Sequence, residues 1–538
     1  MVEHPVVDAK AKKYDRQLRI WGAHGQAALE SAKICLINSG TTGSETLKNL
    51  VLGGIAAFTI VDGAKVEAGD LGNNFLLEAA NLGAPRAQSV TGLLKELNEA
   101  VTGSFVEESA EDLIDGNPAF FRGFDIVVAT QMREASLLKL ESICRESGVK
   151  LLIVRSYGLV GQLRASLGEH VVVESKPDNA VEDLRLHQPW PELAQYAHSL
   201  NLADLDEITH KHVPYAVLLI QAAAQWYEEH AHQRPASYKE RSDFKLLIKS
   251  GQRQIDGCPI DEENFAEAVA NAHKVWAPPP FPSEVHAILE DKAITSLSRS
   301  SSDFWVLAAA LKKFVDTEGG GNLPLEGSIP DMTATTALYL QLHTLYRERA
   351  ERDVAAVEAH VHTLLRSVGR DPKAIPRSTV KNFCKNARNL RVIRYRTLAE
   401  EVGTDTCKSD ALRQAMSAED TVSNATLYLL LRAVDRFHST YNRFPGSYDG
   451  ELEEDVPLLK TIALGILAEC GAGNNTPISD DLVGEMCRFG GGELHCVAAV
   501  MGGIASQEAI KLLTKQFVPL SGTLVYNAMG STTSVFQL

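Results

Sequence analysis

Apolar positions near the start of the chain follow two periods. A run of apolar residues, 34–37 (ICLI), precedes a turn with two glycines, and residues 47–51 then carry apolar side chains at helical spacing. A second apolar run at 57–61 closes on Asp62. The pattern predicts a strand, a helix and a second strand parallel to the first, joined by a right-handed crossover within a parallel sheet.

The same alternation continues through the first third of the chain. Apolar runs predict strands at 105–107, 125–129 and 149–154, with a helix over 134–147 between the last two. We therefore expect residues 1–170 to form the first part of a doubly wound, Rossmann-like α/β domain.

Helical periodicity dominates from about residue 171. Residues 354–364 carry apolar side chains at spacings of three and four, which predicts a helix in a packed bundle or, alternatively, one lining a partner groove. Glycines return near 490, and residues 522–527 predict one more strand. We expect a mainly helical inserted domain over 171–480 and a return to the first domain over 481–538.

Composition narrows the class of protein. The 538 residues exceed what one core usually supports, which predicts two to four domains. The formal net charge of -16 argues against nucleic acid or an anionic membrane as a general partner. The chain shows neither an apolar leader nor a run of about 18 apolar residues, so we expect a soluble intracellular protein.

The eight cysteines are scattered and include no C-x-x-C pair. They indicate neither a disulfide framework nor a structural zinc site, and we expect buried, reduced thiols. His495 with Cys487 and Cys496 is a remote alternative as a metal site, and no bound metal is expected.

The turn at 38–43 (NSGTTG) is the most informative segment. A phosphate-binding turn needs glycines where backbone N–H groups approach an oxyanion. On a G-x-G-G-x-G template only Gly40 and Gly43 remain, because Asn38 stands at the first glycine and Thr41 at the third. Their side chains occupy space that a phosphate would use, although a relaxed phosphate loop remains an alternative.

Several blocks then show a family resemblance. Residues 13–22 (KYDRQLRIWG), 47–55 (LKNLVLGGI) and 60–62 (IVD) resemble the enzymes that adenylate ubiquitin and its relatives. Further blocks narrow the match to the regulatory subunits of neddylation-activating enzymes, especially plant versions. They are 72–75 (GNNF), 104–108 (SFVEE), 154–161 (VRSYGLVG), 176–179 (KPDN), 430–437 (LLRAVDRF), 485–489 (EMCRF) and 514–518 (TKQFV).

The resemblance covers essentially the whole chain and implies a division of labour. Such a subunit has a Rossmann-like adenylation fold interrupted by a helical domain, and it forms a heterodimer with a catalytic subunit. That partner holds ATP, magnesium and the thioester cysteine, and the pair activates the ubiquitin-like neddylation modifier. The resemblance also implies a location in cytoplasm and nucleus and, in a plant, a role in auxin signalling.

Matching the family's active-site blocks to this chain leaves an incomplete adenylation site. Asp62 is retained, where an acidic residue can bind ribose hydroxyls, but the second Asp of the D-x-D pattern is Ala64. Asn73 replaces a phosphate-binding arginine, Arg86 replaces a lysine, and Gln131 replaces the magnesium-binding aspartate. We expect no cofactor on this chain, with Gly40, Gly43 and Asp62 only shaping the turn and strand end.

The family's thioester block, C-T-x-x-x-x-P, has no counterpart here. Cys258, in a polar loop, is the least implausible nucleophile, and we do not expect it to act as one.

Arg16 is the one candidate for a direct catalytic contact. In related dimers an arginine of the N-terminal Y-x-R-Q segment reaches ATP in the partner's site, and Tyr14 to Gln17 (YDRQ) match that segment. Arg16 would then neutralise phosphate charge in trans. The alternative is a solvated arginine on a helix that packs Leu18 and Trp21 inward, and Arg19 is expected to be a surface or interface residue.

Three other functions remain open at this stage. A self-sufficient adenylating enzyme would exchange pyrophosphate without a partner, and a Rossmann oxidoreductase would need an intact dinucleotide turn. A pure scaffold would tolerate loss of Arg16.

Overall fold

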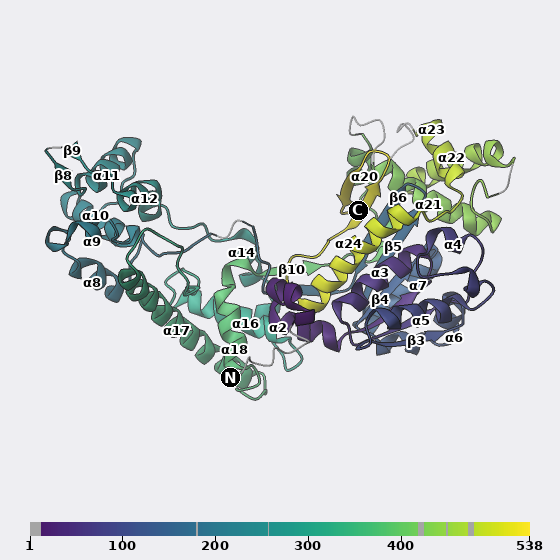
Figure 1. Cartoon of the computed structure of the whole chain (residues 1–538), viewed down its shortest axis with the longest axis horizontal. Coiled ribbons are helices and arrows are strands. Elements are labelled where there is room, and N and C mark those ends of the chain that lie inside the picture. The colour runs from purple at the N-terminus through teal and green to yellow at the C-terminus, as the bar shows by residue number, and fades with distance from the viewer. Residues whose placement is uncertain (1–11, 179–180, 257, 418–423, 448–449, 472–477) are drawn as a thin grey trace, which may run out of the picture. The chain divides into compact units, whose positions relative to one another are not determined.

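The computed structural model describes residues 12–178, 181–256, 258–417, 424–447, 450–471 and 478–538 (Figure 1). The chain divides into two compact units. We call Met1–Val172 with Val392–Leu538 the Rossmann unit, and Val173–Arg391 the helical unit.

An eight-stranded sheet forms the centre of the Rossmann unit, in the order β12-β11-β6-β5-β4-β1-β2-β3. Its strands are β1 (Lys33–Ile37), β2 (Ala57–Val61), β3 (Thr102–Val106), β4 (Ile126–Thr130), β5 (Lys150–Tyr157), β6 (Val160–Ser166), β11 (Thr523–Asn527) and β12 (Thr532–Phe536). The five strands from β3 to β5 are parallel, whereas β6, β11 and β12 pair antiparallel. A separate two-stranded sheet pairs β7 (Glu169–Val172) with β10 (Arg391–Arg394).

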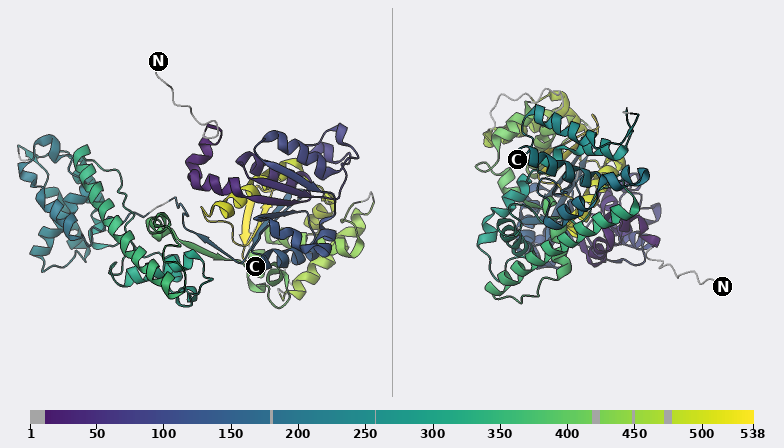
Figure 2. Two further views of the ribbon diagram at one scale, coloured as in Figure 1. Left: turned by 90° about the horizontal axis from the view of Figure 1, so that it is seen from below. Right: turned by 90° about the vertical axis from the view of Figure 1, so that its left-hand side faces the viewer.

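The helices of this unit cover both faces of the sheet (Figure 2). They are α2 (Asp15–Ser31), α3 (Thr41–Gly53), α4 (Asp70–Asn73), α5 (Arg86–Leu97), α6 (Ala110–Gly116), α7 (Glu134–Glu146), α19 (Leu398–Val402), α20 (Ser409–Met416), α21 (Asn424–Tyr441), α22 (Leu452–Glu469), α23 (Asp480–Phe489) and α24 (His495–Thr514).

Strand β1 shows why its sequence reads as an unbroken apolar run. Ile34 and Leu36 pack into the core beneath α3, α5 and α24, while Cys35 and Ile37 pack into a second core beneath α6 and α7. A strand buried on both faces has no polar side to alternate with. The predicted strand, helix and strand are therefore present at β1, α3 and β2.

The helical unit is built from helices and one short hairpin. Its elements are α8 (Pro191–Ser199), α9 (Glu207–His210), α10 (Tyr215–Glu229), α11 (Tyr238–Ser250), β8 (Gln254–Ile255), β9 (Cys258–Pro259), α12 (Glu263–Asn271), α13 (His273–Trp276), α14 (Ser283–Leu289), α15 (Lys292–Thr295), α16 (Asp303–Asp316), α17 (Thr336–Ser367) and α18 (Arg377–Lys385). In α17 the apolar seam of Val354, Val357, Val361 and Leu364 is buried, as a packed bundle requires.

The division of the chain differs from the expected one. The first junction falls at residue 172, close to the expected 170, but residues 392–480 belong with the Rossmann unit rather than with the helical insertion. The physical reason is a shared core. Helices α20 to α23 bury their apolar faces together with Tyr157 and Val160 of the sheet and Val525 of β11.

Two further features depart from the sequence pattern. The predicted parallel sheet is mixed, because three antiparallel strands extend its β5 edge. Within the described residues, one helix, α24, is long and apolar enough to cross a bilayer, but half of that stretch is buried inside the unit. It packs along α3 and β5 as a core helix.

Candidate functional site

The turn between β1 and α3 lies at the carboxyl end of the parallel strands, where Rossmann-like sheets bind ligands. Asn38 has a positive φ of 62° and donates through Nδ2 to the Thr130 carbonyl at 2.8 Å. A Cβ at Gly43 would come within 2.3 Å of the Asn38 carbonyl oxygen. Gly43 is thus required by the close approach of α3 to β1, whatever binds there.

Asp62 directly follows β2, beside this turn, and is buried. Its Oδ2 accepts from the Ser39 backbone N–H at 2.8 Å and from the Ser39 hydroxyl at 2.7 Å. Its Oδ1 accepts from the Ala64 N–H at 2.9 Å. Burial alone would raise the pKa of Asp62, but these bonds and the Arg86 guanidinium outweigh it and hold the pKa below its usual value.

Arg86, at the start of α5, forms ion pairs with acidic side chains of the same chain. Its Nε lies 2.8 Å from Asp62 Oδ2, and its Nη1 lies 3.3 Å from Asp70 Oδ1. Glu493 adds a third, longer-range attraction. The Arg86 guanidinium is therefore already paired within the chain.

Glu493 reaches this turn from the segment before α24. Its Oε2 accepts from the Thr42 backbone N–H at 2.8 Å and from the Thr42 hydroxyl at 2.6 Å. The amino end of a helix attracts anions through its free N–H groups. The chain thus places its own carboxylate on the amino end of α3.

Gln131, just after β4, is the last of the predicted site residues near this turn. Its Nε2 donates to the Ser156 carbonyl at 2.7 Å, and its Oε1 accepts from the Ser156 N–H at 3.2 Å. Burial raises the pKa of Glu493, and hydrogen bonds from Thr42 and from the Gln131 side chain partly offset that rise. A neutral amide suits this position, because an aspartate here would face a second carboxylate.

Asn73 does not belong to this cluster of contacts, although its neighbour does. Asn73 ends the short helix α4 and is partly buried. Asn74 is buried and donates from Nδ2 to the Ser39 carbonyl at 3.1 Å and to the Ser44 hydroxyl at 2.9 Å. Through these two hydrogen bonds Asn74 stabilises the turn.

These residues do not fit a nucleotide or its magnesium ion. The amino end of α3 carries a carboxylate, the ribose-binding position of Asp62 is saturated, and the Gln131 amide bonds to Ser156. Asp62, Asp70 and Glu493 around the single cation Arg86 give a formal charge of -2. Polyphosphate would meet repulsion and find the Ser39 and Thr42 N–H donors already used.

Arg16 lies elsewhere, on α2. The helix is kinked at Gly22, whose φ of 70° is non-helical. Tyr14 and Trp21 anchor the part before the kink: both are buried, and the Tyr14 hydroxyl accepts from Asn98 Nδ2 at 3.1 Å. Arg16 is exposed and forms no hydrogen bond or ion pair with the described residues, whereas Arg19 pairs with Asp15 at 3.0 Å.

The thiols offer no activated nucleophile among the described side chains. Cys35, Cys144, Cys384, Cys470 and Cys487 are buried, and burial raises the pKa of Cys487 to about 12. Cys496 is exposed, contrary to the expectation of buried thiols, because it lies on the outer side of the first turn of α24. The Cys258 side chain lies outside the described part of the chain.

Among the described residues, no cluster of metal ligands replaces the missing adenylation site. In the residues that the structure describes, no three His, Cys, Asp or Glu side chains are grouped to hold a metal ion. Cys487 is buried in the core of α20 to α23 and Cys496 is exposed, so the pairing of both with His495 is not formed.

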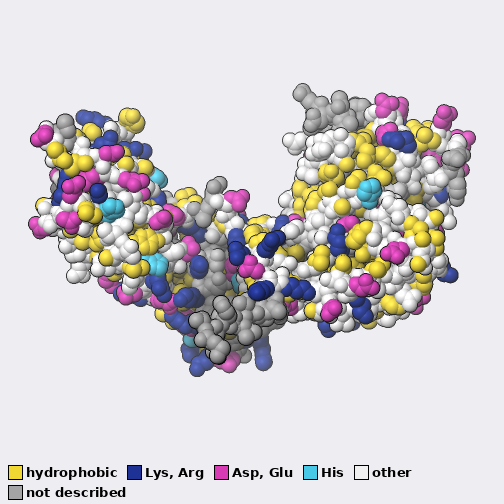
Figure 3. Space-filling view, viewed as in Figure 1, with side chains coloured by type: hydrophobic (Ala, Val, Ile, Leu, Met, Phe, Trp, Pro, Cys, Tyr) yellow, Lys and Arg dark blue, Asp and Glu magenta, His cyan; other side chains and the backbone are white. Residues whose placement is uncertain are grey.

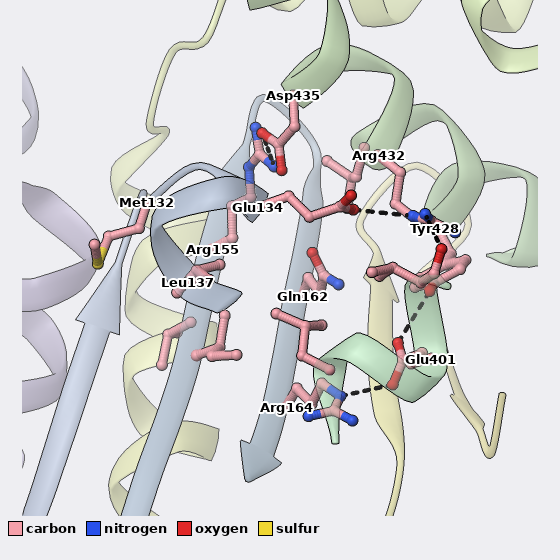
Figure 4. Close-up of a pocket in the computed structure, with 15 residues that line it drawn as sticks. Met132, Glu134, Leu137, Arg155, Gln162, Arg164, Glu401, Tyr428, Arg432 and Asp435 are labelled. Atoms are coloured by element: carbon pink, nitrogen blue, oxygen red, sulfur yellow. Dashed lines mark hydrogen bonds and ion pairs between the residues drawn. The ribbon is translucent and has the colours of Figure 1, made fainter. Parts of the chain in front are cut away.

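A polar cavity between β5, β6 and α21 is one alternative site (Figure 4). It holds about 30 Å³, which suits a water molecule or two. Its charged side chains pair with one another, as Figure 4 shows for Arg432 with Glu134 and Arg164 with Glu401. It is too small and too self-contained for a substrate.

Sequence reasoning found most of the turn but missed what fills it. Asn38, Gly40, Gly43, Asp62, Arg86 and Gln131 do come together at one end of the sheet. Glu493 was missed, because it lies 451 residues from Thr42 in the chain. The glycine run before it was the only local signal.

Comparison with known proteins places the chain in a family. The model of the ThiF family matches residues 14–538. The NEDD8-activating enzyme E1 regulatory subunit AXR1 of Arabidopsis thaliana is 47% identical over 537 residues, covering 100% of this chain and 98% of that protein. AXL, a second such subunit from the same plant, is 49% identical over 517 residues and covers 96% and 97%.

The likeness extends to animals. The NEDD8-activating enzyme E1 regulatory subunit of Xenopus laevis is 47% identical over 534 residues, covering 99% of both chains. These relatives confirm the resemblance that the motifs indicated, and they favour a regulatory subunit over a self-sufficient adenylating enzyme. The chain belongs to the ThiF family and, within it, to the NEDD8-activating enzyme E1 regulatory subunits.

Proposed function

We propose that this chain is the regulatory subunit of a heterodimeric E1 that activates NEDD8, and that ATP and magnesium bind on the catalytic partner. The observation that carries the proposal is likeness over the full length of the chain to regulatory subunits from plants and animals. The filled turn at the head of α3 supports it, because adenylation then has to take place elsewhere.

Arg16 is the group through which the chain would act on the partner's chemistry. Adenylation displaces pyrophosphate, so negative charge grows on the leaving oxygens and a guanidinium can stabilise it. Arg16 is exposed and unpaired among the described residues, on a segment held by Tyr14 and Trp21. A charge on an anchored helix can be presented to a second protein at little entropic cost.

The Rossmann unit also has apolar surface that a partner subunit could cover. Exposed apolar side chains include Leu494 just before α24, Val500 on α24, Met529 before β12 and Val535 on β12. Figure 3 shows hydrophobic side chains gathered over this unit among charged ones. Burying such side chains is the usual driving force of stable heterodimers.

Reconstitution of adenylation tests the proposal. The catalytic subunit of the same source is assayed for ATP–pyrophosphate exchange with NEDD8, alone and with this chain. We expect this chain alone to show no exchange and the pair to exceed the catalytic subunit alone. Exchange by this chain alone would contradict the proposal.

The proposed heterodimer would work in cytoplasm and nucleus. In a plant, the likeness to AXR1 extends the proposal to auxin signalling. A fluorescent fusion of the full chain would show its distribution, and exclusion from both compartments would contradict this part.

A further inference from the structure

We infer that Glu493 is a built-in substitute for phosphate, which closes the former nucleotide site and ties the segment leading into α24 to the turn before α3. The closure depends only on residues of this chain, so it is independent of the proposed partner. Its geometry rests on the paired contacts from Thr42 to the Glu493 carboxylate.

The glycine run before Glu493 lets the carboxylate reach the turn. Helix α23 ends at Gly490 in the left-handed conformation, with φ of 57°, and Gly491 follows with φ of 80°. A Cβ on Gly491 would come within 2.6 Å of the Phe444 ring. The Gly492 carbonyl then accepts from the Gly158 N–H at 2.8 Å, which fixes the backbone beside β5.

The carboxylate also explains why Gly40 remains a glycine. Gly40 has φ of -60° and ψ of -172°, a conformation open to any residue. A Cβ there would meet Glu493 Oε1 at 2.6 Å, and its three nearest heavy atoms all belong to the Glu493 side chain. Gly40 is thus kept small by a carboxylate of the chain rather than by a phosphate.

Neighbouring side chains are adapted to this internal anion. The neutral Gln131 amide helps to lower the raised pKa of Glu493 and so favours its carboxylate, which an aspartate at this position would repel. Arg86 lies close enough to attract Glu493 while it pairs with Asp62 and Asp70. The neutral amide of Gln131 and the carboxylate of Glu493 are therefore two compatible parts of one arrangement.

A double-mutant cycle tests whether Glu493 fills the turn. Melting temperatures are measured for the full chain, Gly40→Ala, Glu493→Ala and the double variant. Glu493→Asp serves as a second background, because its shorter side chain keeps the charge but moves the carboxylate away from Gly40. We expect Gly40→Ala to lower Tm in the wild type and to cost little in either Glu493 background. An equal loss of Tm in all backgrounds would overturn the inference.

Inorganic phosphate tests the closure itself. At constant ionic strength, phosphate should raise the Tm of Glu493→Ala by about 2 °C more than chloride does, because the Thr42 N–H and hydroxyl lose their acceptor and become available. The wild type and Glu485→Ala, a control on the exposed Glu485 to Arg488 pair, should respond equally to both salts. A phosphate response in the wild type, or none in a folded Glu493→Ala chain, would overturn it.

Discussion

Two segments of the Rossmann unit carry the residues of a nucleotide enzyme, and they use them in opposite ways. At the head of α3, Arg86 and Thr42 are bonded to Asp62 and Glu493, so donors that suit a phosphate are consumed inside the chain. On α2, Arg16 is exposed and unpaired among the described residues. The polar groups at the head of α3 are satisfied within the fold. Arg16, in contrast, would find a binding partner only on a second molecule.

The difference teaches how a catalytic fold can lose its own reaction and keep a role in a partner's. Filling the turn conserves the packing of β1, α3 and α24, which any Rossmann-like unit requires. The surface arginine costs the fold little, because α2 is held by Tyr14 and Trp21 rather than by Arg16. Stability and activity are therefore expected to respond to different residues.

Loss of Arg16 should give the largest effect. Arg16→Ala is expected to lower ATP–pyrophosphate exchange by the assembled heterodimer about 10³-fold, because a guanidinium on the leaving phosphates is worth that much in related transfers. Arg19→Ala, which removes an arginine already paired with Asp15, should have little effect. A heterodimer that assembles and exchanges normally with Arg16→Ala would reduce the chain to a scaffold.

Loss of Asp62 should affect stability instead. Asp62→Ala leaves the largely buried Arg86 guanidinium and the Ser39 donors without their acceptor. The free energy of unfolding should fall by about 3 kcal/mol, measured by urea denaturation of the full chain. Asp115→Ala, which breaks an exposed pair with Lys139, should cost less than about 1 kcal/mol. Equal losses would mean that the turn is not a tightly paired cluster.

The contributions of Glu493 and Asp62 to the free energy of unfolding should change in opposite directions as pH rises. The pKa of Glu493 is raised in the fold, so its carboxylate costs stability as pH rises above its ordinary value of 4.5. Glu493→Gln should therefore gain stability relative to the wild type as pH rises above about 4.5. The pKa of Asp62 is lowered, so its contribution is present above its ordinary 3.8 and lost below it. Urea denaturation at several pH values checks both signs.

The smallest effect is expected at Cys258. Cys258→Ser should leave thioester formation by the reconstituted pair unchanged, since the family's catalytic block is absent from this chain. A gel assay that detects a thiol-sensitive adduct on each subunit measures this. An adduct on this chain that Cys258→Ser abolishes would mean that chemistry has not moved entirely to the partner.

Periodicity predicted the parallel half of the sheet, because β1 and β2 are buried on both faces and read as apolar runs. It did not predict β6. That strand contains Arg164, a buried charge that pairs with Glu401 of α19 and with Glu141 of α7. Helical periodicity likewise could not tell which core α21 joins, and the domain boundary at 480 was misplaced for that reason.

The candidate site likewise has a part that the local sequence predicts and a part that only the fold reveals. Asn38, Gly40 and Gly43 lie within one turn, so the local sequence predicts that the phosphate position is altered. What occupies it depends on Glu493, which only the fold brings to Thr42. A single carboxylate at the end of a glycine run has no sequence pattern that marks it as a substitute for phosphate.

The most direct test of the account is a count of bound nucleotide. The assembled heterodimer is titrated with a non-hydrolysable ATP analogue and magnesium in a calorimeter, alongside the heterodimer with Glu493→Gln. We predict one nucleotide for each wild-type heterodimer, bound by the partner. Two nucleotides for each wild-type heterodimer would contradict the claim that the site on this chain is filled from within.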